Sequence, residues 1–282
     1  MLAMETTPTP RSAATPLLLH ACCGPCSLEP VRSLREQGFE PTILYANPNI
    51  HPAAEHHRRL ETLRAWAAEA AVAVEEVPYD PSLWEDAVES MAEQVRERFG
   101  VVCDTEEPHT AAAEARQARC RLCYRLRFEQ AATWARDHGH TTLGTTLSVS
   151  PYQYSDIIRE ELERAAAAAG LQAHFEDYRP LYPEATRRSR ELGMYRQSFC
   201  GCRFSEEEAA IQHEERVARR QAEKAARAEA RREEEERLAA RQQQRAAYEQ
   251  KQARKRAALK ALRAERIEAQ DKDRDRETDH DR

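Results

Sequence analysis

Seven of the eight cysteines in the chain fall into three short clusters, and these clusters are the residues best suited to chemistry. The clusters are Cys22-Cys23-Gly24-Pro25-Cys26, Cys120-Arg121-Leu122-Cys123 and Cys200-Gly201-Cys202. Thiolates bind zinc or iron–sulfur clusters, and two neighbouring thiols can carry electrons by forming a disulfide. A role as small buried hydrophobes explains one cluster more readily than three. For Cys103, which stands alone, that structural role is favoured.

The first two clusters predict a shared metal site. Cys22 and Cys23 directly follow an apolar run at residues 17–21 that predicts a strand, and parallel α/β sheets bind ligands at the carboxyl ends of their strands. Cys120 and Cys123 are three residues apart on a predicted helix, so their thiols share one face. Four thiolates can hold zinc or an iron–sulfur cluster, and the spacing leaves both open.

The third cluster suggests a different use of sulfur. Cys200 and Cys202 are separated by a single glycine, so a disulfide between them closes a small, strained ring. Strain makes such a bond labile, which suits a pair that stores two electrons and releases them. Two further metal ligands are the alternative interpretation.

Strand and helix patterns alternate along the first two hundred residues. Strands are predicted at residues 17–21, 42–45, 72–77 and 140–146. Helices are predicted at residues 27–38 with Ser27 as N-cap, 54–70, from Asp80-Pro81 onward, 111–137, 151–169 and 184–193. This alternation predicts a parallel sheet with right-handed crossovers and helices on both faces. Neither a GxGxxG nor a Walker phosphate loop is present.

The distribution of charge divides the chain into three parts. Residues 1–15 have the composition of a disordered N-terminus, and residues 16–204 have that of a globular domain. Residues 1–204 hold 22 Arg, no Lys and 29 acidic residues, a net charge of −7. Residues 205–282 hold 21 Lys and Arg against 20 acidic residues and have few large apolar side chains.

This tail is too poor in apolar residues for a coiled coil. It predicts a solvated helix that frays toward its end, with a partner-binding or RNA-binding arm as the alternative.

The composition excludes several classes of protein. No apolar run approaches the ~20 residues that span a membrane, and the N-terminal residues lack a signal-peptide pattern. We therefore expect a cytoplasmic protein that has no membrane partner. In that reducing compartment, clustered cysteines indicate metal or redox chemistry rather than structural disulfides.

Six segments of the sequence together resemble one family, the QueH-type epoxyqueuosine reductases. The segments are Leu18-Leu19-His20-Ala21-Cys22-Cys23-Gly24-Pro25-Cys26-Ser27, Asn47-Pro48-Asn49-Ile50, Cys120-x-x-Cys123-Tyr124, Thr145-Thr146-Leu147-x-x-Ser150-Pro151-Tyr152-Gln153, Asp177-Tyr178-Arg179 and Tyr195-Arg196-Gln197-Ser198-Phe199-Cys200-Gly201-Cys202. They follow in the family's order and extend over about residues 16–208. The tail lies outside the resemblance.

The resemblance implies an oxidoreductase of queuosine biosynthesis, which reduces epoxyqueuosine to queuosine at wobble position 34 of tRNA. It implies a [4Fe-4S] cluster held by Cys22, Cys23, Cys120 and Cys123, and a redox-active disulfide between Cys200 and Cys202. Cys26 is a further candidate ligand, either beside the cluster or to an adjacent iron ion. The implied fold is a three-layer Rossmann-like domain of the PP-loop or HUP kind, here carrying a long charged C-terminal helical extension.

A tRNA substrate requires contacts that an acidic domain does not obviously provide. Arg179 and Arg196, which lie inside matched segments, are the candidate phosphate contacts, and Tyr152 and Tyr195 are candidates to stack on the wobble base. Five arginines on the helix at 111–137 and a group near Cys200 are alternative basic patches. Tyr152, Asp156 and Tyr195 are candidate proton donors, although a structural role is favoured for each. The electron donor is unassigned.

Two other functions remain as alternatives. A PP-loop tRNA-thiolating enzyme could share the fold, but its Ser-Gly-Gly-x-Asp-Ser signature is replaced by residues 22–27. A zinc-binding, RNA-binding module without enzymatic activity could use the same cysteines.

Overall fold

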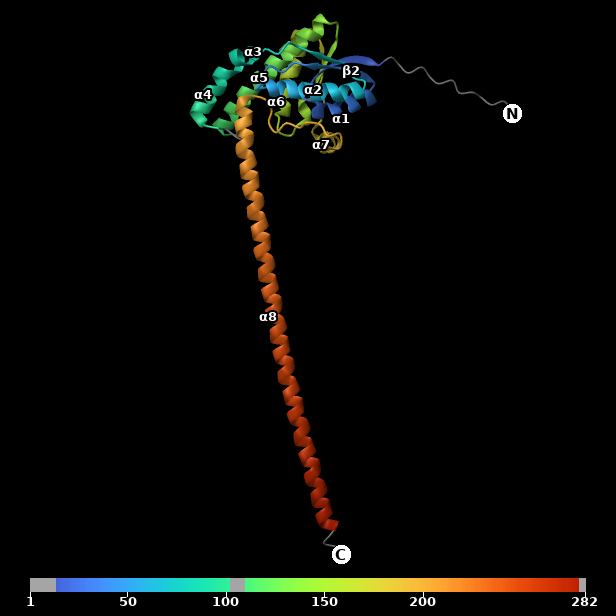
Figure 1. Cartoon of the computed structure of the whole chain (residues 1–282), viewed down its shortest axis with the longest axis vertical. Helices are drawn as coiled ribbons and strands as arrows, with labels where there is room; N and C mark the ends of the chain where they lie inside the picture. The colour runs from blue at the N-terminus through green and yellow to red at the C-terminus, as the bar shows by residue number, and fades with distance from the viewer. Residues whose placement is uncertain (1–13, 102–109, 279–282) are drawn as a thin grey trace, which may run out of the picture. The chain divides into compact units, whose positions relative to one another are not determined.

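In the computed structural model, residues 14–101 and 110–278 are described. Cys103 and nearly all of the N-terminal segment 1–15, which the sequence predicts to be disordered, lie outside these ranges. The described residues contain a five-stranded parallel sheet in the order β3-β2-β1-β4-β5 (Figure 1). The strands are β1 (Thr15–His20), β2 (Phe39–Tyr45), β3 (Val74–Glu76), β4 (Thr142–Thr145) and β5 (Gln172–His174).

The central strand β1 is apolar on both faces, as a strand covered by helices on either side must be. Leu18 pairs with Thr42 of β2 and Leu143 of β4, and residues 17–19 are almost fully buried. Leu17 and Leu19 pack on one face of the sheet, whereas Leu18 packs on the other. The short apolar run therefore forms the middle of the domain.

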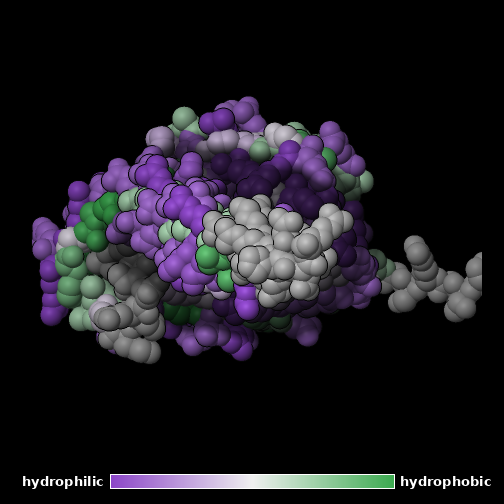
Figure 2. All heavy atoms as spheres, turned by 90° about the horizontal axis from the view of Figure 1, so that it is seen from below, coloured by the Kyte–Doolittle hydropathy of each residue, from purple (hydrophilic) through white to green (hydrophobic). Residues whose placement is uncertain are grey.

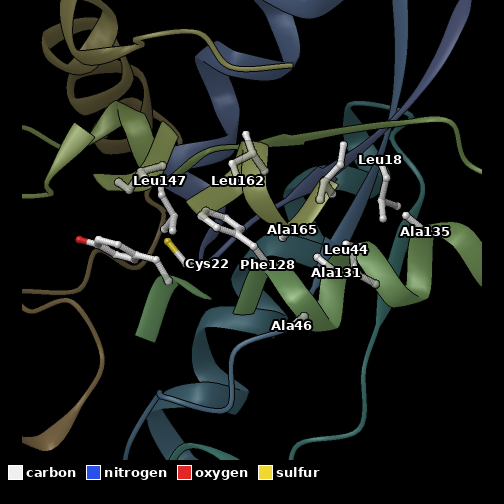
Figure 3. Packing of buried hydrophobic residues seen from close by; sticks show 14 of the residues in the cluster. Leu18, Cys22, Leu44, Ala46, Phe128, Ala131, Ala135, Leu147, Leu162 and Ala165 are labelled. Carbon is white, nitrogen blue, oxygen red and sulfur yellow. The ribbon is translucent and has the colours of Figure 1, made fainter. Parts of the chain in front are cut away.

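Helices cover the two faces of the sheet in separate layers. Helices α1 (Gly24–Glu36) and α2 (Ala53–Glu69) pack over the face that carries Leu17 and Leu19. Helices α5 (Ala111–Asp137) and α6 (Ser155–Ala168) pack over the Leu18 face. Figure 3 shows the Leu18 layer, in which Phe128 and Ala131 of α5 meet Leu162 and Ala165 of α6. The predicted three-layer α/β architecture with a parallel sheet is confirmed.

The remaining described elements are short connections and one long helix. They are α3 (Ser82–Trp84), the π-helix η1 (Glu85–Glu89), α4 (Ser90–Phe99), the 3₁₀ turns η2 (Leu147–Val149) and η3 (Arg179–Leu181), α7 (Tyr182–Glu191) and α8 (Arg203–Thr278).

Two predicted helix starts are wrong at residue level, and one strand was not predicted. Helix α1 begins at Gly24 with Cys23 as its N-cap, and Ser27 lies inside the helix, where its hydroxyl donates to the Cys23 carbonyl oxygen at 2.9 Å. Helix α6 begins at Ser155 rather than Pro151, because residues 151–153 form a turn in which the Gln153 N–H donates to the Ser150 carbonyl. Strand β5 was not predicted, since its three residues carry no apolar alternation.

The helix expected at Asp80-Pro81 begins one position later. Pro81 is the N-cap of α3, and the Asp80 carboxylate accepts hydrogen bonds from the N–H and hydroxyl of Ser82. Asp80 therefore stabilises the turn that precedes the helix rather than its cap position.

The chain divides into two compact units, Met1–His213 and Glu214–Arg282. The second unit consists of the long helix α8 beyond its first turns, which Figure 1 shows as uninterrupted. Side chains on the face seen in Figure 2 are predominantly hydrophilic, with scattered hydrophobic ones. None of the helices described has the length and apolar composition needed to cross a bilayer.

Candidate metal centre and dithiol

The first cysteine cluster lies where β1 ends and α1 begins. The Sγ atoms of Cys22, Cys23 and Cys26 all lie within 4.8 Å of one another, and those of Cys22 and Cys23 are 3.9 Å apart. Figure 3 shows Cys22 beside Phe128 and Leu147 at one end of the α5–α6 core. Cys26, whose role the sequence left open, is thus a full member of the group. A compact set of three thiols at a helix N-terminus suits a thiophilic metal.

The charges within this group are unequal. Hydrogen bonds from Cys23 and Cys26 hold the pKa of Cys22 well below its usual value, although burial opposes the shift. For Cys23 the hydrogen bond to Cys22 raises the pKa to about 12. The shifts therefore favour the thiolate at Cys22 over Cys23 and Cys26. A metal ion would bind here by displacing the thiol protons, and the three sulfur ligands are already close together.

The second and third cysteine clusters line one small cavity. Cys120 and Cys123 of α5 face it together with Cys200 and Cys202, and its volume is about 30 Å³. Burial raises the pKa of Cys123 to about 12 and that of Cys200 to about 11, so both are neutral thiols near pH 7. All four thiols are free in this structure. The tertiary fold brings together cysteines that are about 80 residues apart in the chain.

Two glutamines contact cysteine sulfurs, one in each group. The side-chain amide of Gln197 donates to the Sγ of Cys23 at 3.0 Å, and the Sγ of Cys200 lies 3.8 Å from the Oε1 of Gln153. Gln153 also accepts a 2.6 Å hydrogen bond from the hydroxyl of Tyr124. Neither glutamine was a predicted site residue, although both lie in segments that resemble the family.

Arg127 is a buried cation among these thiols. Its side chain is 1% exposed, and its Nη2 donates to the Asn47 side-chain oxygen at 2.6 Å. Its Nε and Nη1 have no hydrogen-bond partner among the described residues. Burial lowers the pKa of Arg127, but the charges of Cys123, Cys22 and Cys200 outweigh burial and raise it. An orphaned buried guanidinium facing cysteines fits a site that holds a negatively charged group.

A second buried arginine holds the Cys200 segment in place. Arg59 of α2 donates from Nη1 to the Cys200 carbonyl at 2.8 Å and from Nη2 to the Phe199 carbonyl at 3.2 Å. Its Nε donates to Glu55 at 2.7 Å, and the other Glu55 oxygen accepts from the Tyr195 hydroxyl. Arg59 thus fixes the backbone on the N-terminal side of the dithiol.

Gly201 is required at the centre of the dithiol. Its φ of +147° is a conformation that side chains disfavour, and a Cβ there would lie 2.9 Å from Cγ1 of Ile50. The Gly201 carbonyl accepts from the His51 N–H at 2.8 Å, and its own N–H donates to the Ser205 hydroxyl. The dithiol turn is therefore anchored on both sides by backbone hydrogen bonds.

The predicted substrate-binding residues have different surroundings. Tyr152 is 53% exposed and lines the four-cysteine cavity, so it is available to a ligand. The Tyr195 hydroxyl donates to Glu55, and the Arg58 guanidinium lies over its ring.

The charged candidates are engaged within the protein. Arg179 pairs with Asp177. Arg196 donates to the Thr186 carbonyl and the Ser189 hydroxyl, contacts that fix α7. Asp156, a candidate proton donor, pairs with Arg159 on the surface.

Comparison with known proteins assigns the family. The model of the family described as epoxyqueuosine reductase QueH matches residues 17–106 and 104–208, which is more than half of the chain. The chain belongs to the QueH family. The match ends close to the point where α8 begins, so the tail is outside it.

Curated QueH relatives match the same region. The chain is 32% identical to epoxyqueuosine reductase QueH of Dehalococcoides mccartyi over 195 residues, 69% of this chain and 94% of the relative. It is 31% identical to the Thermotoga maritima protein of that name, over 71% of this chain and 94% of the relative. Among solved structures, a predicted subunit of tRNA methyltransferase from Methanocaldococcus jannaschii aligns with 63% of this chain and 88% of its own at 12% identity. Its TM-score of 0.35 is too low to support any inference.

Proposed function

We propose that this QueH-family protein reduces epoxyqueuosine to queuosine at the wobble position of tRNA. Family membership supports the activity. The three-thiol group and the four-thiol cavity support the redox chemistry, because Cys120 of the cavity packs against the same core cluster as Cys22 and Cys23. The observation that carries the proposal is the Cys200/Cys202 pair, which lines the same cavity as Cys120 and Cys123. Gln197, three residues before Cys200 in the chain, donates its side-chain amide to the Cys23 sulfur. A tRNA substrate supports a cytoplasmic location for the protein.

The cysteines suit a resident iron–sulfur centre. We assign Cys22, Cys23, Cys120 and Cys123 as its four thiolate ligands and Cys26 as a ligand of an adjacent iron ion. The compact thiol group and the unpartnered nitrogens of Arg127 support this fit, because a thiolate-ligated cluster is anionic. Such a centre supplies single electrons at low potential, and an adjacent iron ion supplies a Lewis acid.

The dithiol can balance the reaction by itself for one turnover. Epoxide reduction breaks both C–O bonds, forms a C=C bond and releases the oxygen as water, which takes two electrons and two protons. The Cys200 and Cys202 thiols supply both protons and both electrons when they become a disulfide. Because burial raises the pKa of Cys200 to about 11, its proton is retained until the reaction removes it.

The surrounding residues have positioning roles. Arg59 and Gly201 fix the backbone of the dithiol, and Gln153 lies beside the Cys200 sulfur. Tyr152 is the exposed aromatic ring at the cavity and is our candidate to stack on the wobble base. Arg179, Arg196 and Tyr195 are engaged within the protein, which makes them weaker candidates for tRNA contacts.

Anaerobic purification tests the metal assignment. The protein should be brown, absorb near ~400 nm and contain about four irons per chain. C22S and C120S should lose the absorbance, whereas C103S, at the one cysteine outside the clusters, should retain it. A colourless protein with stoichiometric zinc would contradict the assignment and favour the zinc-binding module.

A second assay tests the dithiol. With epoxyqueuosine-containing tRNA and dithionite, the parent and C103S should form queuosine, whereas C200S and C202S should lose sustained turnover. Omitting dithionite should limit the parent to about one product per chain. Unchanged turnover by the double variant C200S/C202S would show that the pair is not a relay.

A further inference from the structure

The arginines of the first unit are mostly engaged with its own carboxylates. Arg116 and Arg119 pair with Glu208, and Arg121 and Arg125 pair with Glu161. Near the dithiol, Arg187 pairs with Glu184, Arg188 with Glu29 and Arg203 with Glu93. Residues 1–204 also have a net charge of −7. The basic patches expected around the site therefore provide little free positive charge for a polyanionic substrate.

The second unit has the opposite character over most of its length. Residues 219–263 contain fifteen Lys and Arg against seven Glu, a net charge of +8. This stretch is helical throughout and lies within α8. The near-neutral charge of the tail as a whole thus conceals a strongly basic stretch, which acidic residues on either side offset.

The basic residues of this stretch gather on one side of the helix. At the 100° per residue of an α-helix, thirteen of the fifteen cations fall within a single 180° arc, and Arg232 and Arg254 are the exceptions. Four of the seven glutamates share that arc, so this half carries a net +9 and the other half a net −1. We call this half of residues 219–263 the basic face. The opposite half is rich in alanine.

The cations of the basic face are exposed and largely unneutralised. All thirteen are exposed to solvent. Arg219 pairs with Glu223 at 3.9 Å and Arg245 with Glu249 at 2.9 Å, and no other ion pair is formed by the face among the side chains that the structure describes. The face extends over about 65 Å, at 1.5 Å per residue. A helix stabilised only by i,i+4 pairs would carry similar numbers of the two charges, whereas this face carries thirteen cations and four glutamates.

We propose that the basic face of α8 binds the phosphate backbone of the tRNA substrate. The proposal rests on the proposed function for the identity of the RNA. Charge complementarity supports RNA as the occupant, because the phosphate backbone is a regular array of negative charges and each cation that neutralises a phosphate releases a counterion. The catalytic unit then needs to recognise only the wobble nucleotide, while α8 supplies affinity that is independent of sequence.

Exchanges of neighbouring residues in the full-length chain test the face without changing composition. The off-face variant R227A/A228R, R245A/A246R, R263A/A264R moves three arginines by 100° round the helix axis, which takes them off the face. The on-face variant R227A/A226R, R231A/A230R, R245Q/Q244R makes the same number of exchanges and keeps every cation on it. Both retain net charge, and circular dichroism should show equal helicity.

Fluorescence anisotropy with an unmodified tRNA transcript gives the affinity separately from turnover. The off-face variant should bind about 10- to 100-fold more weakly than the parent at 100 mM salt, and the slope of log affinity against log salt should fall by about 2. The on-face variant should match the parent. Equal affinity of the two variants would overturn the proposal. So would a loss confined to vesicles of anionic phospholipid, with tRNA binding unchanged.

Turnover separates this inference from the proposed function. With epoxide-containing tRNA, the off-face variant should show a raised KM and an unchanged kcat. A parent that binds tRNA through the face but does not reduce the epoxide would reject the proposed function and retain the RNA contact. If the parent reduces the epoxide and both variants have its KM, the proposed function is retained and the RNA contact is rejected.

Discussion

At the scale of single residues, the buried arginines explain how the site is held before any substrate arrives. A guanidinium in the protein interior is costly unless charge and hydrogen bonds compensate for the lost water. Arg59 is compensated by Glu55 and two carbonyls. Among the described residues, Arg127 has one hydrogen-bond partner, the Asn47 amide oxygen, and interacts electrostatically with Cys22, whose pKa is lowered. Arg59 therefore holds the Cys200 backbone in place, and Arg127 keeps two nitrogens without a described partner near the candidate metal centre.

The role of Arg59 can be tested through the accessibility of Cys200. In R59Q the clamp on the Cys200 carbonyl is lost, so local opening should raise the rate of Cys200 alkylation by about tenfold or more. Mass spectrometry after iodoacetamide pulses measures this rate. R64Q is the control: Arg64 lies on α2 like Arg59, is half-exposed and pairs with Glu76 of β3. In this variant Cys200 should be alkylated at the rate of the parent. Equal labelling of R59Q and the parent would show that the turn holds its shape without the clamp.

At the scale of elements, Glu161 joins α6 to α5. Its side chain is 2% exposed, and it accepts hydrogen bonds from Arg121 and Arg125 of α5 and from Arg164 of α6. Burial raises the pKa of Glu161, but these three arginines outweigh burial and bring it to about 2. Because the pKa is depressed in the folded state, the stabilisation is present above the usual glutamate pKa and is lost as pH falls from about 5 toward 2.

Replacing Glu161 should show this dependence directly. E161Q should lower the free energy of unfolding by about 1–3 kcal/mol at pH 7, less than for a fully buried pair because its arginine partners are partly exposed. The difference from the parent should shrink as pH falls below about 5. Urea unfolding at pH 7, 5 and 4 measures it. E160Q, whose carboxylate is mostly exposed, should change stability by less than about 0.5 kcal/mol. A difference that is constant with pH would contradict the assignment.

At the scale of the whole molecule, the two units differ in how they are stabilised. The first unit buries apolar side chains on both faces of a sheet, whereas residues 214–264 of α8 are almost entirely exposed. A helix without tertiary packing depends on propensity and local ion pairs alone, so it opens and closes rapidly.

Hydrogen exchange should resolve this difference. Backbone amides of residues 219–263 should exchange within seconds to minutes, while those around the buried Phe128 of α5 should resist for much longer. Adding tRNA should slow exchange in the basic face if its helix becomes ordered on the RNA. Strong protection of residues 219–263 in the protein alone would show that α8 packs against another surface.

Local patterns in the sequence are sufficient for most of the fold. The apolar run at 17–21 marked the central strand, the predicted helix at 111–137 has the bounds of α5, and parallel pairing followed from the alternation of strands and helices. Ser27 was misassigned because α1 begins three residues earlier, so the Ser27 hydroxyl donates to the carbonyl of the N-cap residue Cys23 instead of capping the helix. The three-residue strand β5 owes its conformation to pairing with β4 rather than to its own residues.

The amino-acid sequence by itself determined which side chains are available for chemistry, since the three cysteine clusters and the charged tail can be identified from residue types and spacing alone. Only the tertiary structure decided which of them meet. Cys26 joins Cys22 and Cys23, four more thiols share one cavity, and most candidate arginines form ion pairs with carboxylates of the same unit. Such contacts span up to 174 residues, as between Gln197 and Cys23. No local pattern encodes them, because they depend on how helices pack over the sheet.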